Sequence, residues 1–533
     1  MQIKPKKLLR HQKIKSSFFY QYNNIVEAFF DKEKKLRNKN FLIFPEENQL
    51  SFSYSDFKKE FLNISIFLKK YNLKKGDKIS IIFFNQPEFF LFYFSCLSNG
   101  LVLVPINPDL SPREIDYIIN NSESKLVIYS KKISYKIITL KKNLKKKISF
   151  LSINSFKDLK VYKQNQFLKT PKKKVFLHDL AIIIYTSGTT GNPKGVVLSH
   201  LNLMANSISI SKWLKFNQKT ISMCIMPLFH NNGQIPSFLS VMLSEGTIVV
   251  TPGKTSILNF WNLIEKYKVT FVSIMSSILS ILLNIQKKKK NNSLKLITSG
   301  GQVLLKSVKI QFEKKFKVPI FENYGLTETS SIACINDFPA RKRKAGSIGK
   351  PLPTNEMAIL DNKSGKILDA NIEGEICIKG HNVAAKYYKL NNNNKIAFSR
   401  GWFHSGDFGI RDKNNYFYFR GRKDSLIIKG GENIYPAEIE NVLYKNLLIQ
   451  ECAVIGIPDK MLGENICAFV RLRKDHSTNA EEIKENLKGK IAGFKQPKEI
   501  IILNNEKKLT SIPKGPTKKI LYRELRKFYE KRK

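Results

Sequence analysis

The chain has 533 residues, of which 42% are hydrophobic and 11% aromatic, and this composition excludes a disordered chain and predicts two or more domains with packed cores. Lysine and arginine outnumber aspartate and glutamate by 91 to 43, which gives a formal net charge of +48. Because the basic residues are scattered and densest only at 341–344, we interpret the excess as a general bias toward Lys, Asn, Ile and Phe, and we expect no specific nucleic-acid partner.

The N-terminal stretch is basic and lacks the apolar core of a signal peptide. The longest apolar stretch, 89–108, approaches membrane length, but polar residues and Gly100 interrupt it. This pattern predicts a helix, a turn and a buried strand, and no transmembrane segment. The six cysteines form no CxxC pair and no zinc spacing, which is typical of a reducing compartment. We therefore expect a soluble, cytoplasmic protein.

Short apolar runs alternate with amphipathic segments along the first 300 residues, which predicts an α/β fold with mainly parallel sheets. Ligands should then collect at the loops that follow the strands. After about residue 400 the pattern becomes alternating and glycine-punctuated, and a helix is expected near 479–490. This part predicts a separate small α/β domain. The predicted strands are 78–84, 101–105, 125–130, 180–185, 246–252 and 295–300.

Glycines and small hydroxyl side chains crowd the stretch 185–200, which follows an apolar run. Glycine lets the main chain approach a ligand closely, and the hydroxyl groups add donors to the exposed amides. A polyphosphate needs many donors and a compact positive charge such as Lys194. The stretch differs from a Walker-type loop because Pro193 precedes the lysine and Gly195 follows it. The predicted phosphate-binding residues are Thr186, Ser187, Gly188, Thr189, Thr190, Gly191 and Lys194.

This stretch, "YTSGTTGNPKGVVLSH", resembles the phosphate-loop signature of the adenylate-forming superfamily, of the acyl-CoA synthetase or carboxylate-CoA ligase type. Six further stretches resemble the family's other signatures, in the family's order, and the resemblance is weakest before about residue 180. They are 226–233 (MPLFHNNG), 298–304 (TSGGQVL), 323–329 (NYGLTET), 401–409 (GWFHSGDFG), 418–440 and 512–520.

The resemblance implies a large N-terminal α/β domain, 1–423, of layered mainly parallel sheets with a small β-barrel-like part. A small, mobile C-terminal α/β domain, 424–533, would follow a hinge at Asp424. The implied activity is an ATP-dependent carboxylate-thiol ligase. Such an enzyme forms an acyl adenylate and pyrophosphate from ATP and a carboxylic acid, and then transfers the acyl group to CoA. ATP, Mg²⁺ and CoA are the implied cofactors.

The family signatures also imply roles for single residues. Thr327 would contact the α-phosphate, and Glu328 would bind Mg²⁺, which prefers carboxylate and phosphate oxygens. Tyr324 would lie against the adenine and Asp407 would accept hydrogen bonds from the ribose. The implied adenine and ribose residues are Gly301, Tyr324, Gly325, Asp407 and Arg422.

In the small domain, Lys519 would offset negative charge during adenylation. The family usually has glycine directly before this lysine, whereas this chain has Lys518, which leaves Lys518 as the alternative and raises the question of impaired adenylation. Gly430 and Gly431 would line the CoA channel after the small domain rotates at its hinge.

The acid pocket is implied to include Phe229, His230, Gly233 and Gly300. The 226–233 stretch has no aspartate to pair with a substrate ammonium, so a fatty or other aliphatic acid is the first expectation and an aryl acid the second. CoA is the expected acceptor, with a separate acyl carrier protein as the alternative. Two other classes stay open: a catalytically silent relative that binds nucleotide or acyl ligand, and a polyanion-binding protein that uses the basic charge.

Overall fold

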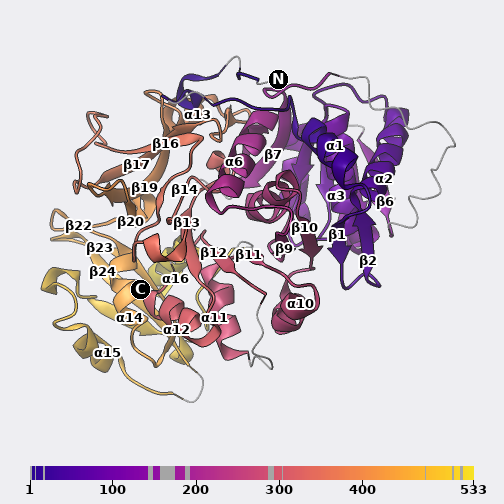
Figure 1. The fold of residues 1–533 in the computed structure, drawn as a ribbon. Helices are drawn as coiled ribbons and strands as arrows, with labels where there is room; N and C mark the ends of the chain where they lie inside the picture. The colour runs from indigo at the N-terminus through magenta and orange to yellow at the C-terminus, as the bar shows by residue number, and fades with distance from the viewer. Residues whose placement is uncertain are drawn as a thin grey trace. The chain divides into compact units, whose positions relative to one another are not determined.

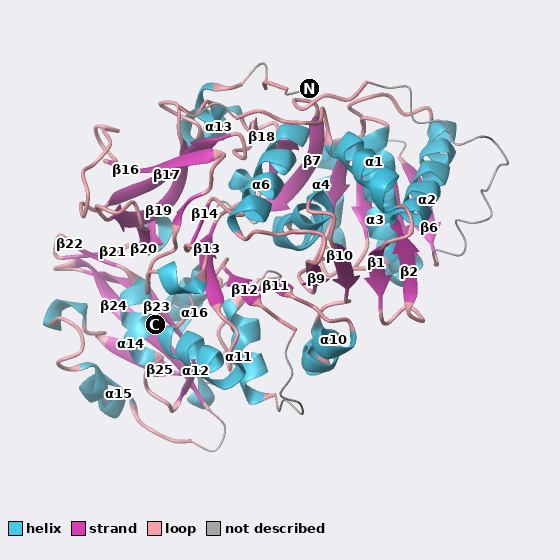
Figure 2. Cartoon of the chain, viewed as in Figure 1, coloured by secondary structure: helices cyan, strands magenta, loops and turns pink. Residues whose placement is uncertain are grey.

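The structure is a computed structural model, and it describes residues 3–5, 8–15, 18–141, 148–155, 174–186, 193–285, 293–302, 304–473, 476–506, 509–515 and 520–532. It is a mixed α/β protein with a large N-terminal part and a smaller C-terminal part, as the sequence predicts (Figure 2). The chain divides into two compact units. The first unit is Met1–Leu304, Ile310–Met357 and Cys377–His404, and the second is Leu305–Lys309, Ala358–Ile376 and Ser405–Lys533.

The first unit contains a nine-stranded sheet of order β15-β14-β13-β12-β11-β9-β10-β1-β2. Its inner strands pair in parallel from β13 to β1, and antiparallel pairs close both edges. The inner strands are buried apolar runs, as expected for a parallel sheet covered on both faces. The strands are β1 (Asn40–Phe44), β2 (Leu50–Ser53), β9 (Ile221–Cys224), β10 (Thr247–Val250), β11 (Phe271–Ile274), β12 (Leu296–Ser299), β13 (Ile320–Tyr324), β14 (Cys334–Ile335) and β15 (Lys350–Pro351).

A seven-stranded sheet of order β18-β8-β7-β4-β3-β5-β6 forms the second large sheet of this unit. The strands from β7 to β6 pair in parallel, whereas β8 is antiparallel to both β7 and β18. The strands are β3 (Lys78–Ile82), β4 (Val102–Pro105), β5 (Ser124–Ser130), β6 (Ser149–Ile153), β7 (Leu180–Thr186), β8 (Lys194–Ser199) and β18 (Lys386–Tyr387).

Helices cover these sheets, and α1, α2 and α3 lie side by side (Figure 1). Helix α3 is buried along its whole length and ends before Gly100, after which the chain enters β4. None of the helices that the structure describes is long and apolar enough to cross a membrane. The helices are α1 (Ile25–Leu36), α2 (Tyr54–Phe67), α3 (Pro87–Ser98), α4 (Pro112–Ser122), α5 (Ser134–Lys141), α6 (His200–Trp213), α7 (Asn231–Gln234), α8 (Ser240–Leu243), α9 (Lys254–Leu258), α10 (Phe260–Lys266), α11 (Ser276–Asn284), α12 (Lys306–Phe316) and α13 (Asn391–Ala397).

All six strands predicted from the apolar runs are present, as β3, β4, β5, β7, β10 and β12, and the stretch 89–108 is the predicted helix, turn and strand. The helix expected near 479–490 is α15 (Ala480–Leu487). None of the six cysteines forms a disulfide bond, and all six are buried.

The second unit is built on the long hairpin of β23 and β24, to which β21 and β25 add. Two hydrophobic clusters pack against this sheet, one of which includes α14 and α15 and the other α16. Strands β19 and β20 belong to a further sheet of order β16-β17-β19-β20. The elements are β16 (Asn355–Leu360), β17 (Gly374–Gly380), β19 (Phe403–Arg411), β20 (Phe417–Arg422), β21 (Ile427–Lys429), β22 (Glu432–Ile434), α14 (Pro436–Leu443), β23 (Ile449–Asp459), β24 (Gly463–Leu472), β25 (Glu499–Ile502) and α16 (Tyr522–Arg532).

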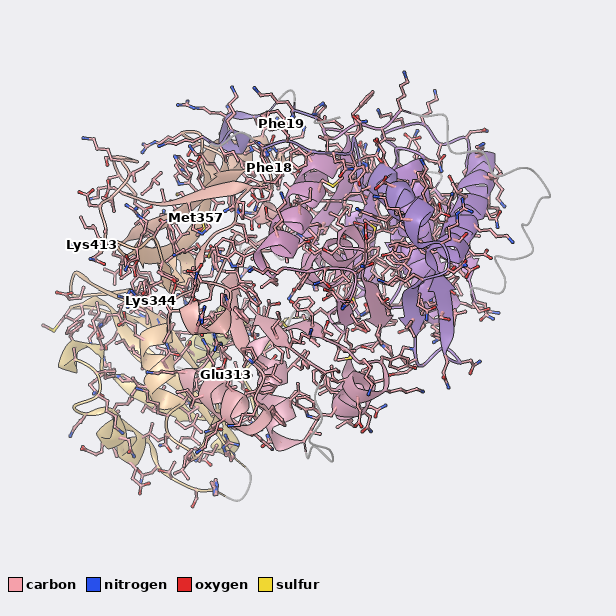
Figure 3. The ribbon with its side chains drawn as sticks, viewed as in Figure 1. Phe18, Phe19, Glu313, Lys344, Met357 and Lys413 are labelled. Atoms are coloured by element: carbon pink, nitrogen blue, oxygen red, sulfur yellow. The ribbon has the colours of Figure 1, made fainter. Side chains whose placement is uncertain are left out.

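The N-terminal segment 8–20, which precedes α1, is bound to residues far along the chain. The ring nitrogen Nε2 of His11 donates to the carbonyl oxygen of Ala384 at 3.0 Å, and Gln12 Nε2 donates to that of Val383 at 2.9 Å. Nearby, Lys212 Nζ lies 5.1 Å from the ring centroid of Phe18, which is labelled in Figure 3. No local sequence pattern indicates this attachment.

Candidate active site

The hydroxyl-rich stretch runs from the end of β7 into β8, and these two strands pair in an antiparallel hairpin. Thr186 ends β7 and is the register partner of Lys194, which begins β8. The apolar residues of both strands are buried, so the hairpin is anchored in the seven-stranded sheet. The predicted phosphate ligands Ser187, Gly188, Thr189, Thr190 and Gly191 lie outside the described residues.

The NYGLTET stretch carries β13 into a short 3₁₀ helix, Thr327–Thr329. The turn needs glycine, because a Cβ on Gly325 would lie 1.7 Å from the carbonyl oxygen of Ser331. A Cβ on Gly300, after β12, would lie 2.2 Å from Oδ1 of Asn323 in β13. The approach of Gly300 to Asn323 brings the 298–304 and 323–329 stretches together at the ends of neighbouring parallel strands, which is where the fold predicts a ligand site.

Tyr387 contacts both Glu328 and Lys194, the first residue of β8. Its hydroxyl donates to Glu328 Oε1 at 2.7 Å, and Lys194 Nζ lies 5.6 Å from the centroid of its ring. The main chain is fixed as well, because the Ala384 amide donates to the Glu328 carbonyl oxygen at 2.7 Å. The structure thus brings together two of the predicted residues, Lys194 and Glu328, around a tyrosine that the sequence analysis did not single out.

The Glu328 carboxylate fits a magnesium ligand in both chemistry and accessibility. The residue is half-buried, and among the described residues no hydrogen bond or ion pair reaches its second oxygen, Oε2. Mg²⁺ is usually held by one or two protein carboxylates together with substrate phosphates. A half-exposed carboxylate near Lys194, the lysine of the predicted phosphate-binding stretch, meets that requirement.

The MPLFHNNG stretch contacts the NYGLTET stretch through Asn231, whose side-chain amide donates to the Thr327 carbonyl oxygen at 3.2 Å. Phe229 is buried, and its ring centroid lies 4.7 Å from that of His230, which directly precedes α7. A Cβ on Gly233 would lie 2.5 Å from the Pro227 carbonyl oxygen. Close backbone packing therefore explains why this position holds a glycine.

The remaining nucleotide residues fall into two groups. In the first unit, Gly301 has a φ of +80°, and a Cβ added there would meet no atom within 4 Å, while Tyr324 ends β13. In the second unit, Asp407 of β19 and Arg422 of β20 are register partners, and Arg422 Nη1 lies 3.2 Å from Asp407 Oδ1. Asp407 is buried, whereas nearly half of the Arg422 side chain is exposed, so the guanidinium is within reach of a ligand.

The predicted hinge and channel residues lie in exposed turns of the second unit. Asp424 is in a 3₁₀ turn, Lys423–Ser425. Gly430 and Gly431 connect β21 to β22 with φ values of +59° and +87°, the region that favours glycine. Lys518 and Lys519 lie outside the described residues.

Sequence reasoning missed Tyr387 and Asn231. Asn231 lies inside a stretch that was already identified, so its short distance along the chain from His230 could have suggested it. Tyr387 reaches the site only because β18 pairs with β8, which starts nearly two hundred positions earlier in the chain, and no local pattern reports such a pairing.

Comparison with known proteins agrees with this geometry. The AMP-binding enzyme family matches residues 29–388, and the AMP-binding enzyme C-terminal domain matches residues 438–514. A long-chain-fatty-acid–CoA ligase of Bacillus subtilis is 30% identical over 503 residues, which cover 85% of this chain and 88% of the relative. An oxalate–CoA ligase of Arabidopsis thaliana is 32% identical over 459 residues, covering 82% and 87%.

The fold comparison extends over nearly the whole chain. The crystal structure of ATP-bound MatB from Rhodopseudomonas palustris superposes with a TM-score of 0.86 at 26% identity, covering 96% of this chain and 99% of that one. With matching family domains, full-length relatives and this fold, the chain belongs to the AMP-binding enzyme family and is an AMP-forming acid-thiol ligase that joins a carboxylic acid to CoA.

Proposed function

We propose that this ligase activates a fatty or other aliphatic acid as its acyl adenylate and then transfers the acyl group to CoA. The observation that carries the nucleotide half is the arrangement of Lys194 and Glu328 around Tyr387, because it offers a cation for phosphate and a carboxylate for Mg²⁺. The aliphatic acid is supported by the fatty-acid relative from Bacillus subtilis and by the buried Phe229.

In the first step, a carboxylate oxygen of the acid attacks the α-phosphorus of ATP, and the bond to the β-phosphate oxygen breaks to release pyrophosphate. Lys194 and the hydroxyl groups of its hairpin bind the phosphates. Thr327 contacts the α-phosphate, and Glu328 would hold a magnesium ion, which would supply further positive charge at the phosphates. Lys519, or Lys518 in its place, adds an ammonium beside the reacting groups.

The ribose and base are held by other residues. Tyr324 lies against the adenine, with Gly301 and Gly325 beside it, and the Asp407 carboxylate accepts hydrogen bonds from the ribose hydroxyls while Arg422 binds as a permanent cation. Gly300 and Gly233 shape the acid pocket with Phe229 and His230.

In the second step, the thiol sulfur of CoA attacks the acyl carbon, its proton leaves to solvent or a base, and AMP departs. A rotation at Asp424 would bring Gly430 and Gly431 to the pantetheine arm. Two variations keep the same chemistry: an aryl acid as substrate, and a carrier-protein phosphopantetheine as acceptor. The printed names of the relatives already span acids as different as a long-chain fatty acid and oxalate.

The test is acid-dependent ATP/pyrophosphate exchange, screened over fatty, short-chain, dicarboxylic and aryl acids, followed by thioester formation with CoA and with a carrier protein. Exchange with aliphatic acids that is lost in Lys519→Ala supports the proposal and excludes a substitute role for Lys518. Exchange only with aryl or dicarboxylic acids overturns the substrate assignment. ATP binding without exchange for any acid identifies a silent relative.

A further inference from the structure

Two adjacent tyrosines, Tyr387 at the end of β18 and Tyr388 directly after it, each donate a hydrogen bond to a carboxylate. Tyr387 donates to Glu328 Oε1 at 2.7 Å, and Tyr388 donates to Glu123 Oε2 at 2.7 Å. The two phenols reach different carboxylates although the residues are neighbours in the chain. Only Tyr387 reaches a residue of the candidate active site, so the pair contains its own internal control.

The Tyr387 phenol is held in place from several directions. The side chain of Asn394 bonds its main chain twice, accepting from the Tyr387 amide at 2.6 Å and donating to its carbonyl oxygen at 2.9 Å. Tyr387 is also the register partner of Val196, two residues after Lys194, and its ring centroid lies 5.6 Å from that of Phe398. Only 7% of the residue is exposed. A phenol that is held so firmly can fix the orientation of a partner.

We propose that Tyr387 is a positioning residue that orients the Glu328 carboxylate toward the magnesium of bound ATP, and that Asn394 holds Tyr387 in place for this role. The inference rests on the proposed magnesium role of Glu328. Partners that hydrogen-bond a ligating carboxylate fix its orientation and influence metal affinity as strongly as some ligands do. Tyr387 occupies that position because its bond engages Oε1 and leaves Oε2 for the ion.

Besides the negatively charged Glu328, Tyr387 has a positively charged neighbour, Lys194. Lys194 lies over its ring, and among the described residues Lys194 and Glu328 do not form an ion pair with each other. A direct pair would withdraw both groups from a substrate, since each would neutralise the other. By binding one group through its hydroxyl and the other through its ring, Tyr387 keeps the cation for phosphate and the carboxylate for metal.

Asn394 gives a functional reason for part of the asparagine run 391–394. The run has the composition expected from a general sequence bias, and Asn391 and Asn392 are exposed. Asn394, in contrast, is half-buried and makes the two bonds to Tyr387. The structure therefore separates one functional asparagine from its neighbours of the same type.

The experiment measures ATP binding by calorimetry over a series of Mg²⁺ concentrations and also without Mg²⁺. Tyr387→Phe keeps the ring and loses the hydroxyl, and it should raise the Mg²⁺ concentration for half-maximal tightening by about tenfold. Asn394→Ala should shift it in the same direction by less. ATP affinity without Mg²⁺ should stay at the wild-type value in both variants.

Matched controls are Tyr388→Phe, which removes the equivalent hydroxyl-carboxylate bond of the neighbouring residue to Glu123, and Asn392→Ala on the same helix as Asn394. Both should leave the Mg²⁺ dependence unchanged. Thermal melting of each ligand-free variant establishes that it is folded. If Tyr388→Phe shifts the Mg²⁺ dependence as much as Tyr387→Phe does, the effect is not specific to the Tyr387 hydroxyl and the inference is wrong.

Glu328→Ala and the double variant with Tyr387→Phe complete a thermodynamic cycle. Tyr387→Phe should add nothing once Glu328 is removed, and an additive effect overturns the inference. A wild-type Mg²⁺ dependence in Glu328→Ala instead refutes the metal role of Glu328 itself, and the inference falls with it. A shift in Glu328→Ala without any in Tyr387→Phe refutes the positioning role alone and leaves the proposed function standing.

Discussion

The two units each contain a glutamate that is bound by a tyrosine hydroxyl, but the two carboxylates have different surroundings. In the first unit, the Glu328 carboxylate accepts one hydrogen bond among the described residues, from Tyr387 at 2.7 Å. In the second, Glu440 of α14 accepts from the Val454 amide at 2.9 Å and from the Tyr522 hydroxyl at 3.1 Å. Burial raises the pKa of Glu440 to about 7 despite these donors.

The comparison shows that a hydrogen bond from tyrosine to glutamate occurs in two different surroundings. Two donors on one oxygen and a desolvated site make Glu440 a connection between α14, β23 and the start of α16. One donor and partial exposure leave Glu328 able to take a further ligand. A tyrosine-glutamate bond therefore predicts a binding role only where the carboxylate keeps an accessible oxygen.

The largest expected effect is on the Glu328 side of the comparison. Glu328→Gln keeps the shape and an acceptor for Tyr387 but loses the charge, so ATP/pyrophosphate exchange should fall by about a hundredfold or more. The melting temperature of the ligand-free protein should not fall. Glu440→Gln, in the second unit, is the control variant. Exchange at the wild-type rate in Glu328→Gln would show that the Glu328 charge is not needed for adenylation.

A second prediction concerns stability against pH on the Glu440 side. The pKa of Glu440 rises from its ordinary value of 4.5 to about 7 in the folded protein, so between these values the folded state binds more protons than the unfolded state. Stability from this group is therefore highest below pH 4.5 and is lost as the pH rises through 7, by about 3 kcal/mol in full.

Glu440→Gln removes this titration while keeping an acceptor for Val454 and Tyr522. Urea unfolding at pH 5 and pH 8 should show that the variant loses less stability across this range than the wild type and is the more stable protein at pH 8. If the variant and the wild type lose the same stability between pH 5 and pH 8, Glu440 is not desolvated as described.

The smallest expected effect comes from Tyr522→Phe, which removes one donor from Glu440. The loss should cost about 1 kcal/mol of unfolding free energy. Because the Tyr522 bond lowers the pKa of Glu440, its removal should move the midpoint of the pH-dependent stability to higher pH. In the double variant with Glu440→Gln, the pH-dependent change in stability should be absent. If it persists there, another group is responsible for the titration.

Local patterns predicted six of the strands and the turn at Gly100, because buried parallel strands are continuous apolar runs and tight turns favour glycine. The runs at 180–185 and 295–300 are β7 and β12, and Gly325 lies where only glycine fits. Long-range pairing was not predictable in the same way. Tyr387 meets Glu328 only through the antiparallel pairing of β18 with β8, and Asn394 looked like one member of a biased run.

The attachment of the N-terminal segment also sets an order for the making of the protein. The carbonyl groups that His11 and Gln12 bind, on Ala384 and Val383, are synthesised more than 370 residues after them. The segment must stay undocked while the intervening residues are synthesised, because long-range contacts form only when both partners are present. Completion of the first unit therefore brings together residues that are synthesised at very different times. They meet beside the main chain of Glu328, whose carbonyl oxygen accepts a hydrogen bond from the Ala384 amide.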